Sequence, residues 1–199
     1  MSYAIVGFGK IGQALARAFA RKHQRDCRES SATRGVSPAG SGDWAHCRCK
    51  VAARGAQGGH HFSGGPVGEH RDVAKALPSW KGKTIIDAMN SFPVPPEELD
   101  GLPSSAFAAT SFTGAKLVKG FNHLIAATLA TDPIIEGGHR VVFLSSDNED
   151  AVAPVADLAK QLGFAPVKLG KLNEGGWLVH ARGRTWGQLI FQDVFKKQQ

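Results

Sequence analysis

The 199-residue sequence has few cysteines and no long apolar run. Its three cysteines are an odd number, which does not suit a secreted disulfide framework, so the cytoplasm is the expected location. No stretch approaches the roughly 18 apolar residues of a membrane span, and we expect no contact with a membrane. The opening residues, MSYAIVGFGK, lack the basic flank and the cleavage site of a signal peptide. These absences favour an ordinary globular protein.

Residues 23–68 lack the apolar residues that a folded core needs, and we expect the printed segment to supply no strand of a sheet. They contain no Leu, Ile, Met or Tyr, but they hold nine Gly and six Lys or Arg. All three cysteines, Cys27, Cys47 and Cys49, lie here, together with four of the eight histidines. Three interpretations are open: a zinc site, a basic arm for nucleic acid, or a segment read out of frame.

The composition and spacing of this segment argue against the first two interpretations. Cys47, Cys49, His60 and His61 offer four ligands, but C-x-C with two adjacent histidines is not the usual zinc spacing. We therefore predict no metal site. The net charge of +7 suits anionic ligands, yet the segment also holds three acidic residues and would interrupt a sheet. We therefore predict no nucleic-acid partner.

We interpret residues 23–68 as frame-shifted relative to the rest of the chain. Reading the codons one base later can turn GDWAHCRCK into A-I-G-P-T-V-V-A and GGHHFSGGPV into A-D-I-I-F-L-A-V-P. Both products are apolar and typical of strands. The same shift can turn RDCRESS into V-T-V-A-S-R. Ordinary sequence stops near Lys22 and resumes near Glu69, as a pair of frame slips would require.

A glycine-rich turn joins a strand to a helix at the start of the chain. Residues 3–6 are a short apolar run typical of a buried parallel strand, and apolar residues from Ile11 onward have helical spacing. The intervening G-x-G-x-x-G lets the backbone approach a pyrophosphate, which the helix amides and dipole then bind. The predicted cofactor-binding residues of this turn are Gly7, Phe8, Gly9, Lys10, Ile11 and Gly12.

Strands and helices alternate from residue 69 onward. A capping box, Ser146 to Glu149, is expected to begin one long helix, and Gly163 to end it. The alternation predicts an α/β fold with a Rossmann-type, doubly wound parallel sheet and a short C-terminal helical part. The expected elements are helices at 69–77, 123–130 and 146–163, a helix or long turn at 104–115, and strands at 84–89, 116–121, 139–146 and 164–170.

Several of these segments carry a family resemblance. AIVGFGKIGQALA, IIDAMN, LVKGFNHL, RVVFLSSDNEDA and LGFAPVKLGKLNEGG together resemble the NADP-dependent oxidoreductases related to deazaflavin (coenzyme F-420) reductases. The motifs follow the family's order and spacing over residues 1–22 and about 69–199. The resemblance implies a dinucleotide-binding domain at 1–145 and an α/β extension at 146–199 that shapes an acceptor pocket. It also implies a homodimer, and hydride transfer between NADPH and a flavin-like or deazaflavin acceptor.

The predicted ligand-binding asparagines follow two of the strands. Asn90 and Asn122 stand at strand ends, where open α/β sheets bind ligands. The resemblance places such residues near the nicotinamide or the acceptor ring, and we assign Asn90 to the cofactor and Asn122 to the acceptor. An asparagine that satisfies its own turn is the alternative. Gly65 and Pro66 stand where another strand should end beside the cofactor, with an irrelevant turn as the alternative.

The nucleotide preference depends on the reading frame. In the shifted frame a Ser-Arg pair falls at Glu29 and Ser30, and an arginine there accommodates the 2′-phosphate of NADP. We therefore expect NADP(H), with Ser30 as a cofactor-binding position. In the tail, where the family's relatives shape the acceptor pocket, the predicted residues are Trp177, His180 and Arg182. Aromatic residues at such positions also suit a structural core.

No catalytic acid, base or nucleophile is predicted. Hydride transfer to a planar ring requires the protein to hold the donor carbon against the acceptor and to exclude water. The expected partner is a small-molecule acceptor. Two other function classes stay open. One is a non-catalytic NADP-binding sensor or scaffold, and the other is a basic nucleic-acid binder with salt-dependent binding.

Overall fold

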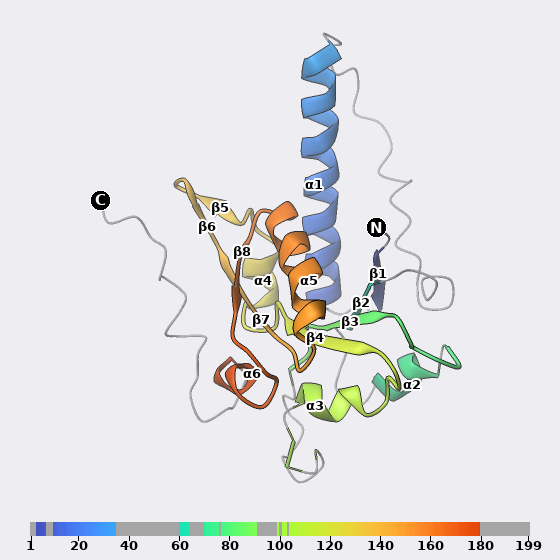
Figure 1. Ribbon diagram of the computed structural model, residues 1–199. Coiled ribbons are helices and arrows are strands. Elements are labelled where there is room, and N and C mark those ends of the chain that lie inside the picture. Colours follow the sequence, from blue (N-terminus) through green and yellow to red (C-terminus); the bar gives the residue numbers. More distant parts are fainter. Residues whose placement is uncertain are drawn as a thin grey trace.

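A mixed six-stranded sheet forms the centre of the protein. The computed structural model describes residues 3–6, 10–34, 60–63, 70–75, 77–90, 99, 101–102 and 104–179. The strand order across the sheet is β1-β2-β3-β4-β7-β8 (Figure 1). These strands are β1 (Tyr3–Val6), β2 (His60–Ser63), β3 (Thr84–Asp87), β4 (Lys116–Gly120), β7 (Val141–Ser145) and β8 (Ala165–Lys168).

The sheet confirms the predicted Rossmann-type α/β fold, with one difference in strand direction. Strands β1 to β4 are all parallel. Strand β7 is antiparallel to β4, and β8 is parallel to β7, so the last two strands reverse the direction. The connection from β4 to β7 holds only the four-residue helix α4 (Ala126–Leu129) and a hairpin, β5 (Ile134–Ile135) and β6 (Gly138–His139). A parallel pairing would need a longer crossover that returns the chain to the starting edge.

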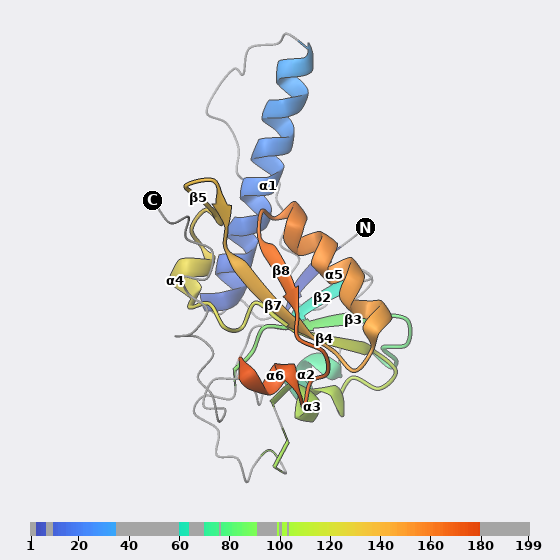
Figure 2. The same cartoon turned by 60° about the vertical axis from the view of Figure 1, so that its left-hand side comes forward.

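Helices cover both faces of the sheet. Helices α1 (Lys10–Arg34) and α5 (Glu149–Gln161) lie on one face, and α2 (His70–Ala74), α3 (Ser104–Ala109) and α6 (Gly175–Leu178) lie on the other (Figures 1 and 2). This arrangement buries both sides of the inner strands. Strands β3 and β7 accordingly consist of buried residues throughout, as the apolar runs TII and VVFL predict.

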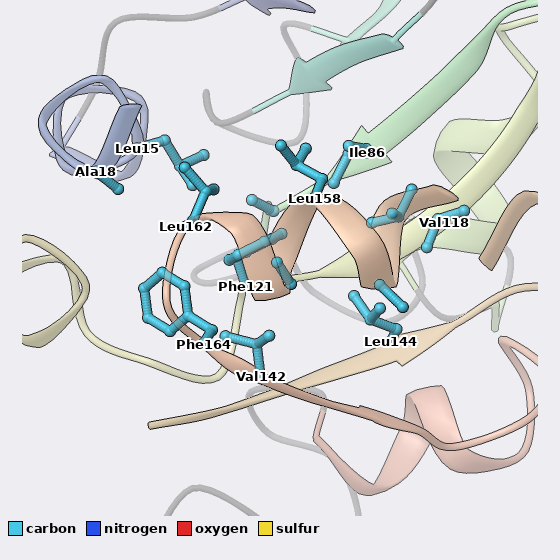
Figure 3. Close-up of a cluster of buried hydrophobic side chains, with 14 of the residues drawn as sticks. Leu15, Ala18, Ile86, Val118, Phe121, Val142, Leu144, Leu158, Leu162 and Phe164 are labelled. Atoms are coloured by element: carbon cyan, nitrogen blue, oxygen red, sulfur yellow. The ribbon is translucent and has the colours of Figure 1, made fainter. Parts of the chain in front are cut away.

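The main hydrophobic core lies between the sheet and the face covered by α1 and α5. Leu15 and Ala18 of α1 point toward Leu158 and Leu162 of α5 (Figure 3). The sheet contributes Ile86, Val118, Val142 and Leu144, and Phe121 and Phe164 close the cluster with an edge-to-face contact at 5.9 Å between ring centroids. The apolar stripe of α5, Val152, Val155 and Leu158, and its C-cap residue Leu162 are all buried.

The segment expected to be unable to form sheet structure does contribute one strand. The residues printed as His60-His61-Phe62-Ser63 form β2, which pairs with β1 on one side and β3 on the other. The expectation that this segment supplies no strand was therefore wrong at this place. The strand coincides with I-I-F-L in the shifted reading, an apolar sequence that suits an inner parallel strand.

Helix α1 also extends into that segment. Its 25 residues span about 37 Å at roughly 1.5 Å per residue, far more than the four or five residues of a strand in this sheet require. Its far half projects beyond the sheet (Figure 1). Ser30, expected after a second strand, lies inside this helix. That difference arises because the printed residues 23–34 include many good helix formers and no Gly or Pro to end the helix.

Helix α5 differs from its prediction at the first turn and matches it at the last. Its N-cap is Asn148, one residue before Glu149, so the expected capping box is wrong. The hydroxyl of Ser146 instead donates to the carbonyl of Leu117 at 2.6 Å and accepts the amide of Asn148 at 3.0 Å. Gly163 ends the helix with a φ of +96°, as predicted, and the amide of Phe164 donates to the carbonyl of Ala159 at 2.9 Å, which is a Schellman motif.

No helix among the described residues is long and apolar enough to span a membrane.

Candidate functional site

The candidate site lies at the edge where strands β1 to β4 have their carboxyl ends. Parallel strands of an open α/β sheet bring their C-terminal residues to one edge, which is where such sheets bind ligands. Strand β1 ends at Val6 on this edge, and α1 begins at Lys10, four residues further along the sequence. Lys10 is exposed and Ile11 half-buried in the first turn of α1, and Gly12 is buried. The buried Gly12 fits the close packing of helix on strand that this glycine is expected to allow.

A buried polar row crosses three neighbouring strands next to this edge. Asp87 of β3 is the register partner of Lys119 of β4, and Lys119 is the partner of Ser145 of β7. The side chains of Lys119 and Asp87 are 2% and 0% exposed, and their charged atoms are 3.4 Å apart. Burial lowers the pKa of Lys119, while the Asp87 carboxylate acts in the opposite direction. The pairing of these two residues is not predictable from the sequence pattern, because it depends on the register between β3 and β4.

This pair holds the loop that carries Asn90. The ammonium group of Lys119 donates to the carbonyl of Met89 at 2.6 Å, and one carboxylate oxygen of Asp87 accepts the amide of Met89 at 2.9 Å. The other oxygen accepts the hydroxyl of Ser105 from α3. Both backbone polar groups of Met89 are therefore fixed by buried charges, and the position of Asn90, the next residue, is fixed with them.

The structure brings the two predicted asparagines together. The side-chain amide of Asn90 donates to the backbone carbonyl of Asn122 at 2.8 Å, and the amide of Asn122 donates to Oδ1 of Asn90 at 3.1 Å. The same Asn122 amide donates to the carbonyl of Val179 at 3.0 Å, directly after α6. The alternative that each asparagine satisfies only its own turn is therefore wrong. The two form a seam that joins the ends of β3 and β4 to α6.

The backbone before Asn122 is strained. Phe121 is fully buried and has a φ of +63°, a left-handed conformation that bulky residues rarely adopt. Such strain is typical of functional sites, where the surrounding packing holds it in place. Here the left-handed residue directly follows β4, and after it the Asn122 side chain reaches Val179 beyond α6 and the His123 ring packs on β7.

His123 is a neutral, buried side chain beside the seam. Its Nε2 lies 3.0 Å from the carbonyl oxygen of Val141, which can only accept, so Nε2 carries the hydrogen. Its ring packs edge-to-face on Phe143, with centroids 4.8 Å apart. Burial lowers the pKa of His123 to about 4, so near pH 7 the ring is neutral and Nδ1 is a hydrogen-bond acceptor.

The stability of the protein should depend on pH through His123. Burial holds its pKa at about 4 in the folded state, against 6.5 for an unperturbed histidine. Because the unfolded chain binds the proton more readily, stability is fully present above about pH 6.5 and is lost as the pH falls toward 4. The loss should be about 3 kcal/mol. Urea unfolding of the wild type and His123→Phe at several pH values tests this, because the variant should lose that part of the pH dependence. Equal dependence in both proteins would contradict it.

Helix α6 packs tightly against the sheet beside this seam. A Cβ atom on Gly175 would lie 1.7 Å from the carbonyl oxygen of Leu169, so only glycine fits there. A Cβ atom on Gly176 would meet only ordinary contacts, the nearest being Ser145 at 3.4 Å. Trp177, a predicted acceptor-pocket residue, lies half-buried in this helix.

The two adjacent glycines of α6 make a matched pair of variants. Gly175→Ala should lower the free energy of unfolding by about 1–3 kcal/mol or more, because the backbone must move to admit the methyl group. Gly176→Ala should be close to neutral. Urea unfolding of both variants measures the difference, and equal effects would show that α6 does not pack as described.

The other predicted site residues are not brought to the edge by the described structure. Ser30 lies in α1, about 30 Å along the helix from Lys10 at roughly 1.5 Å per residue, so the printed residue is remote from the glycine-rich turn. No group of three or more potential metal ligands occurs within the described ranges. The predicted residues that lie outside those ranges are Gly7, Phe8, Gly9, Gly65, Pro66, His180 and Arg182.

The comparison with solved structures identifies the family. The hypothetical protein SMa0349 from Sinorhizobium meliloti matches with a TM-score of 0.73 and 32% identity, over 92% of this chain and 91% of that chain. The chain belongs to the family of that protein. A protein assigned as an F420-dependent NADP reductase, from Arthrobacter sp. FB24, shares the fold, with a TM-score of 0.61 and 23% identity over 96% of both chains. No protein-family model matches the chain.

Curated relatives match over a shorter stretch. The metalloreductase STEAP2 of mouse is 36% identical over 94 residues, which is 46% of this chain and 18% of that protein. The chain thus matches less than a fifth of the length of this relative. Together with the structural neighbours, it confirms the predicted resemblance to NADP-dependent oxidoreductases.

Proposed function

We propose that the protein is an NADPH-dependent oxidoreductase that transfers a hydride between nicotinamide and a flavin-like or deazaflavin acceptor. Reductases among both the structural neighbours and the curated relatives support an NADP-dependent oxidoreductase. The observation that carries the proposal is the Asn90–Asn122 seam at the carboxyl edge of the sheet. It lies on the same edge as the glycine-rich turn, where a dinucleotide would present its nicotinamide.

The proposed reaction moves two electrons as a hydride. NADPH loses the hydride from its nicotinamide carbon and becomes NADP⁺, and the acceptor ring takes up the hydride together with a proton from water. The residues of this chain orient the two rings and exclude water. His123 is not the proton donor, because burial lowers its pKa to about 4 and leaves its ring neutral near pH 7.

The partner and location of the enzyme are also proposals. We propose NADP(H) in preference to NAD(H), a cytoplasmic location because of the low and odd number of cysteines, and a homodimer by analogy with the family. The nucleotide preference depends on the arginine that the shifted frame supplies after the second strand. Size-exclusion chromatography with light scattering would measure the oligomeric state.

NADPH oxidation with different acceptors tests the proposed function. Loss of NADPH absorbance is followed with riboflavin, 5-deazariboflavin, a quinone or a ferric chelate, and each assay is repeated with NADH. We expect turnover with the flavin or deazaflavin, and a preference for NADPH over NADH of about tenfold or more. Turnover only with the ferric chelate would overturn the flavin-like acceptor. Tight NADPH binding without turnover on any acceptor would instead favour a non-catalytic NADP-binding sensor.

A further inference from the structure

Two buried hydrogen-bond acceptors lie side by side in the sequence at the candidate site. Asn122 and His123 are 2% and 6% exposed. Oδ1 of Asn122 and Nδ1 of His123 have no hydrogen-bond partner in the described part of the chain. The Asn122 amide and the His123 Nε2–H are both engaged, by Asn90, Val179 and Val141. The two side-chain atoms that have no partner, Asn122 Oδ1 and His123 Nδ1, are therefore both hydrogen-bond acceptors.

Leaving such atoms unpaired costs free energy. A buried polar atom without a hydrogen bond typically costs about 1–3 kcal/mol, so a folded protein contains few of them. This pair also follows Phe121, whose left-handed φ of +63° adds backbone strain. Two unpaired acceptors and a strained residue at the ligand edge indicate a place for a group that the described part of the chain does not supply.

We propose that Asn122 Oδ1 and His123 Nδ1 form a specificity pair that binds N–H donors of the ligand. The inference rests on the proposed function, and it deepens it by stating what the ligand must carry. Two ligand groups have this chemistry: the carboxamide of the nicotinamide, and the pyrimidine N–H of a flavin-like acceptor. A quinone ring offers only acceptors, and a ferric chelate of carboxylates offers no N–H, so neither satisfies the pair.

The residue that follows α6, Val179, packs beside this pair. The carbonyl of Val179, directly after α6, accepts a hydrogen bond from the Asn122 amide, and Val179 packs with Val141 and Phe143 beside the His123 ring. A ligand that reaches Oδ1 and Nδ1 therefore displaces the end of α6. The new hydrogen bonds to the two acceptors offset the packing that this movement disrupts.

Matched ligands distinguish the two sources of the N–H donor. Lumiflavin and 3-methyllumiflavin differ by one pyrimidine N–H, and NADPH and its 3-acetylpyridine analogue differ by the carboxamide N–H. Binding of each is measured directly by fluorescence titration, without turnover. We expect one of the two pairs to show about tenfold weaker binding for the ligand that lacks the N–H. The ligand pair that shows this difference in binding identifies whether the protein binds the flavin N–H or the carboxamide N–H.

A variant shows whether His123 contributes to the discrimination. His123→Phe removes Nδ1, keeps an aromatic ring and leaves Asn122 Oδ1 in place, so it should bind the two members of the discriminated pair more nearly equally than the wild type does. Ser145→Ala is the control, because its hydroxyl is also buried without a partner in the described chain but lies on β7 opposite Lys119 and is not one of the two proposed acceptors. Ser145→Ala should keep the wild-type ratio. A variant that merely loosens the fold would weaken both members and leave their ratio unchanged.

The outcomes separate this inference from the proposed function. Discrimination that is reduced in His123→Phe and persists unchanged in Ser145→Ala supports the specificity pair. Binding of NADPH or lumiflavin without discrimination in either pair overturns it, even if NADPH oxidation proceeds. If the protein does not bind NADPH but distinguishes lumiflavin from 3-methyllumiflavin, the result would support the specificity pair as a site for the acceptor. It would overturn the proposed oxidoreductase activity. Failure to bind either ligand would overturn both.

Discussion

The Lys119→Met variant is expected to lose about 3–5 kcal/mol of its free energy of unfolding, because it leaves the Asp87 carboxylate buried without its cation. Asp87 is fully buried, and its remaining partners, the Met89 amide and the Ser105 hydroxyl, are neutral. The loss of the bond from Lys119 to the Met89 carbonyl would also release the loop that positions Asn90. Urea unfolding at neutral pH measures the change.

Strand β4 supplies its own control for this prediction. Lys116 lies three residues earlier and pairs with Asp150, but the two side chains are 44% and 68% exposed. Lys116→Met should therefore change stability very little, because solvent screens exposed pairs. The double variant Lys119→Met/Asp87→Asn should recover a large part of the loss, since neither partner then leaves a buried charge. A loss in Lys116→Met as large as that in Lys119→Met would contradict the role assigned to burial.

The combined variant His60→Ile/His61→Ile/Ser63→Leu is expected to be more stable than the printed chain. Strand β2 lies between β1 and β3 in a sheet with helices on both faces, a position that favours a continuous apolar run. Burial of a large aliphatic side chain contributes about 1.5–3 kcal/mol, so the three changes together should add several kcal/mol. For a chain of this size each kcal/mol corresponds to roughly 2–4 °C in melting temperature.

A surface substitution controls for a general effect of added isoleucine. His139 lies exposed in the β5–β6 hairpin, and its Nδ1 is 2.7 Å from the carbonyl of Gly163. His139→Ile should give no gain in stability.

Peptide mass mapping of the purified protein over residues 23–68 tests the reading frame directly. Peptides such as V-T-V-A-S-R and A-D-I-I-F-L-A-V-P would confirm the frame shift. The printed peptides, together with an unchanged or lowered melting temperature in the triple variant, would contradict it.

The parts of the fold that follow local patterns were predictable. The spacing of apolar residues and the composition were sufficient to predict strands β1, β3, β4, β7 and β8, because an inner strand is an apolar run between turn residues. The C-terminal end of α5 was predictable because Gly163 adopts the left-handed conformation that glycine favours. The N-terminal end of α5 was not predictable, because the Ser146 hydroxyl donates to the carbonyl of Leu117 in β4 and does not cap the helix.

The candidate site was predictable only in part. Asn90 and Asn122 stood out because each follows a strand, and the end of a parallel strand is a general ligand position. Lys119 was missed because it lies in the apolar run KLVKGF, and its pairing with Asp87 depends on the register between β3 and β4. The sequence does not display that register. The left-handed Phe121 was missed for a related reason, since tertiary packing and not residue type imposes it.

Isotope transfer from NADPH tests the proposed reaction most directly. The purified protein is incubated with NADPH that carries deuterium at the transferred position of the nicotinamide, together with 5-deazariboflavin, whose ring carbon retains the hydride it receives. Mass spectrometry should then find the deuterium in the reduced deazaflavin, in proportion to the NADP⁺ formed. Reduced deazaflavin without deuterium, or no oxidation of NADPH at all, would contradict hydride transfer at this site.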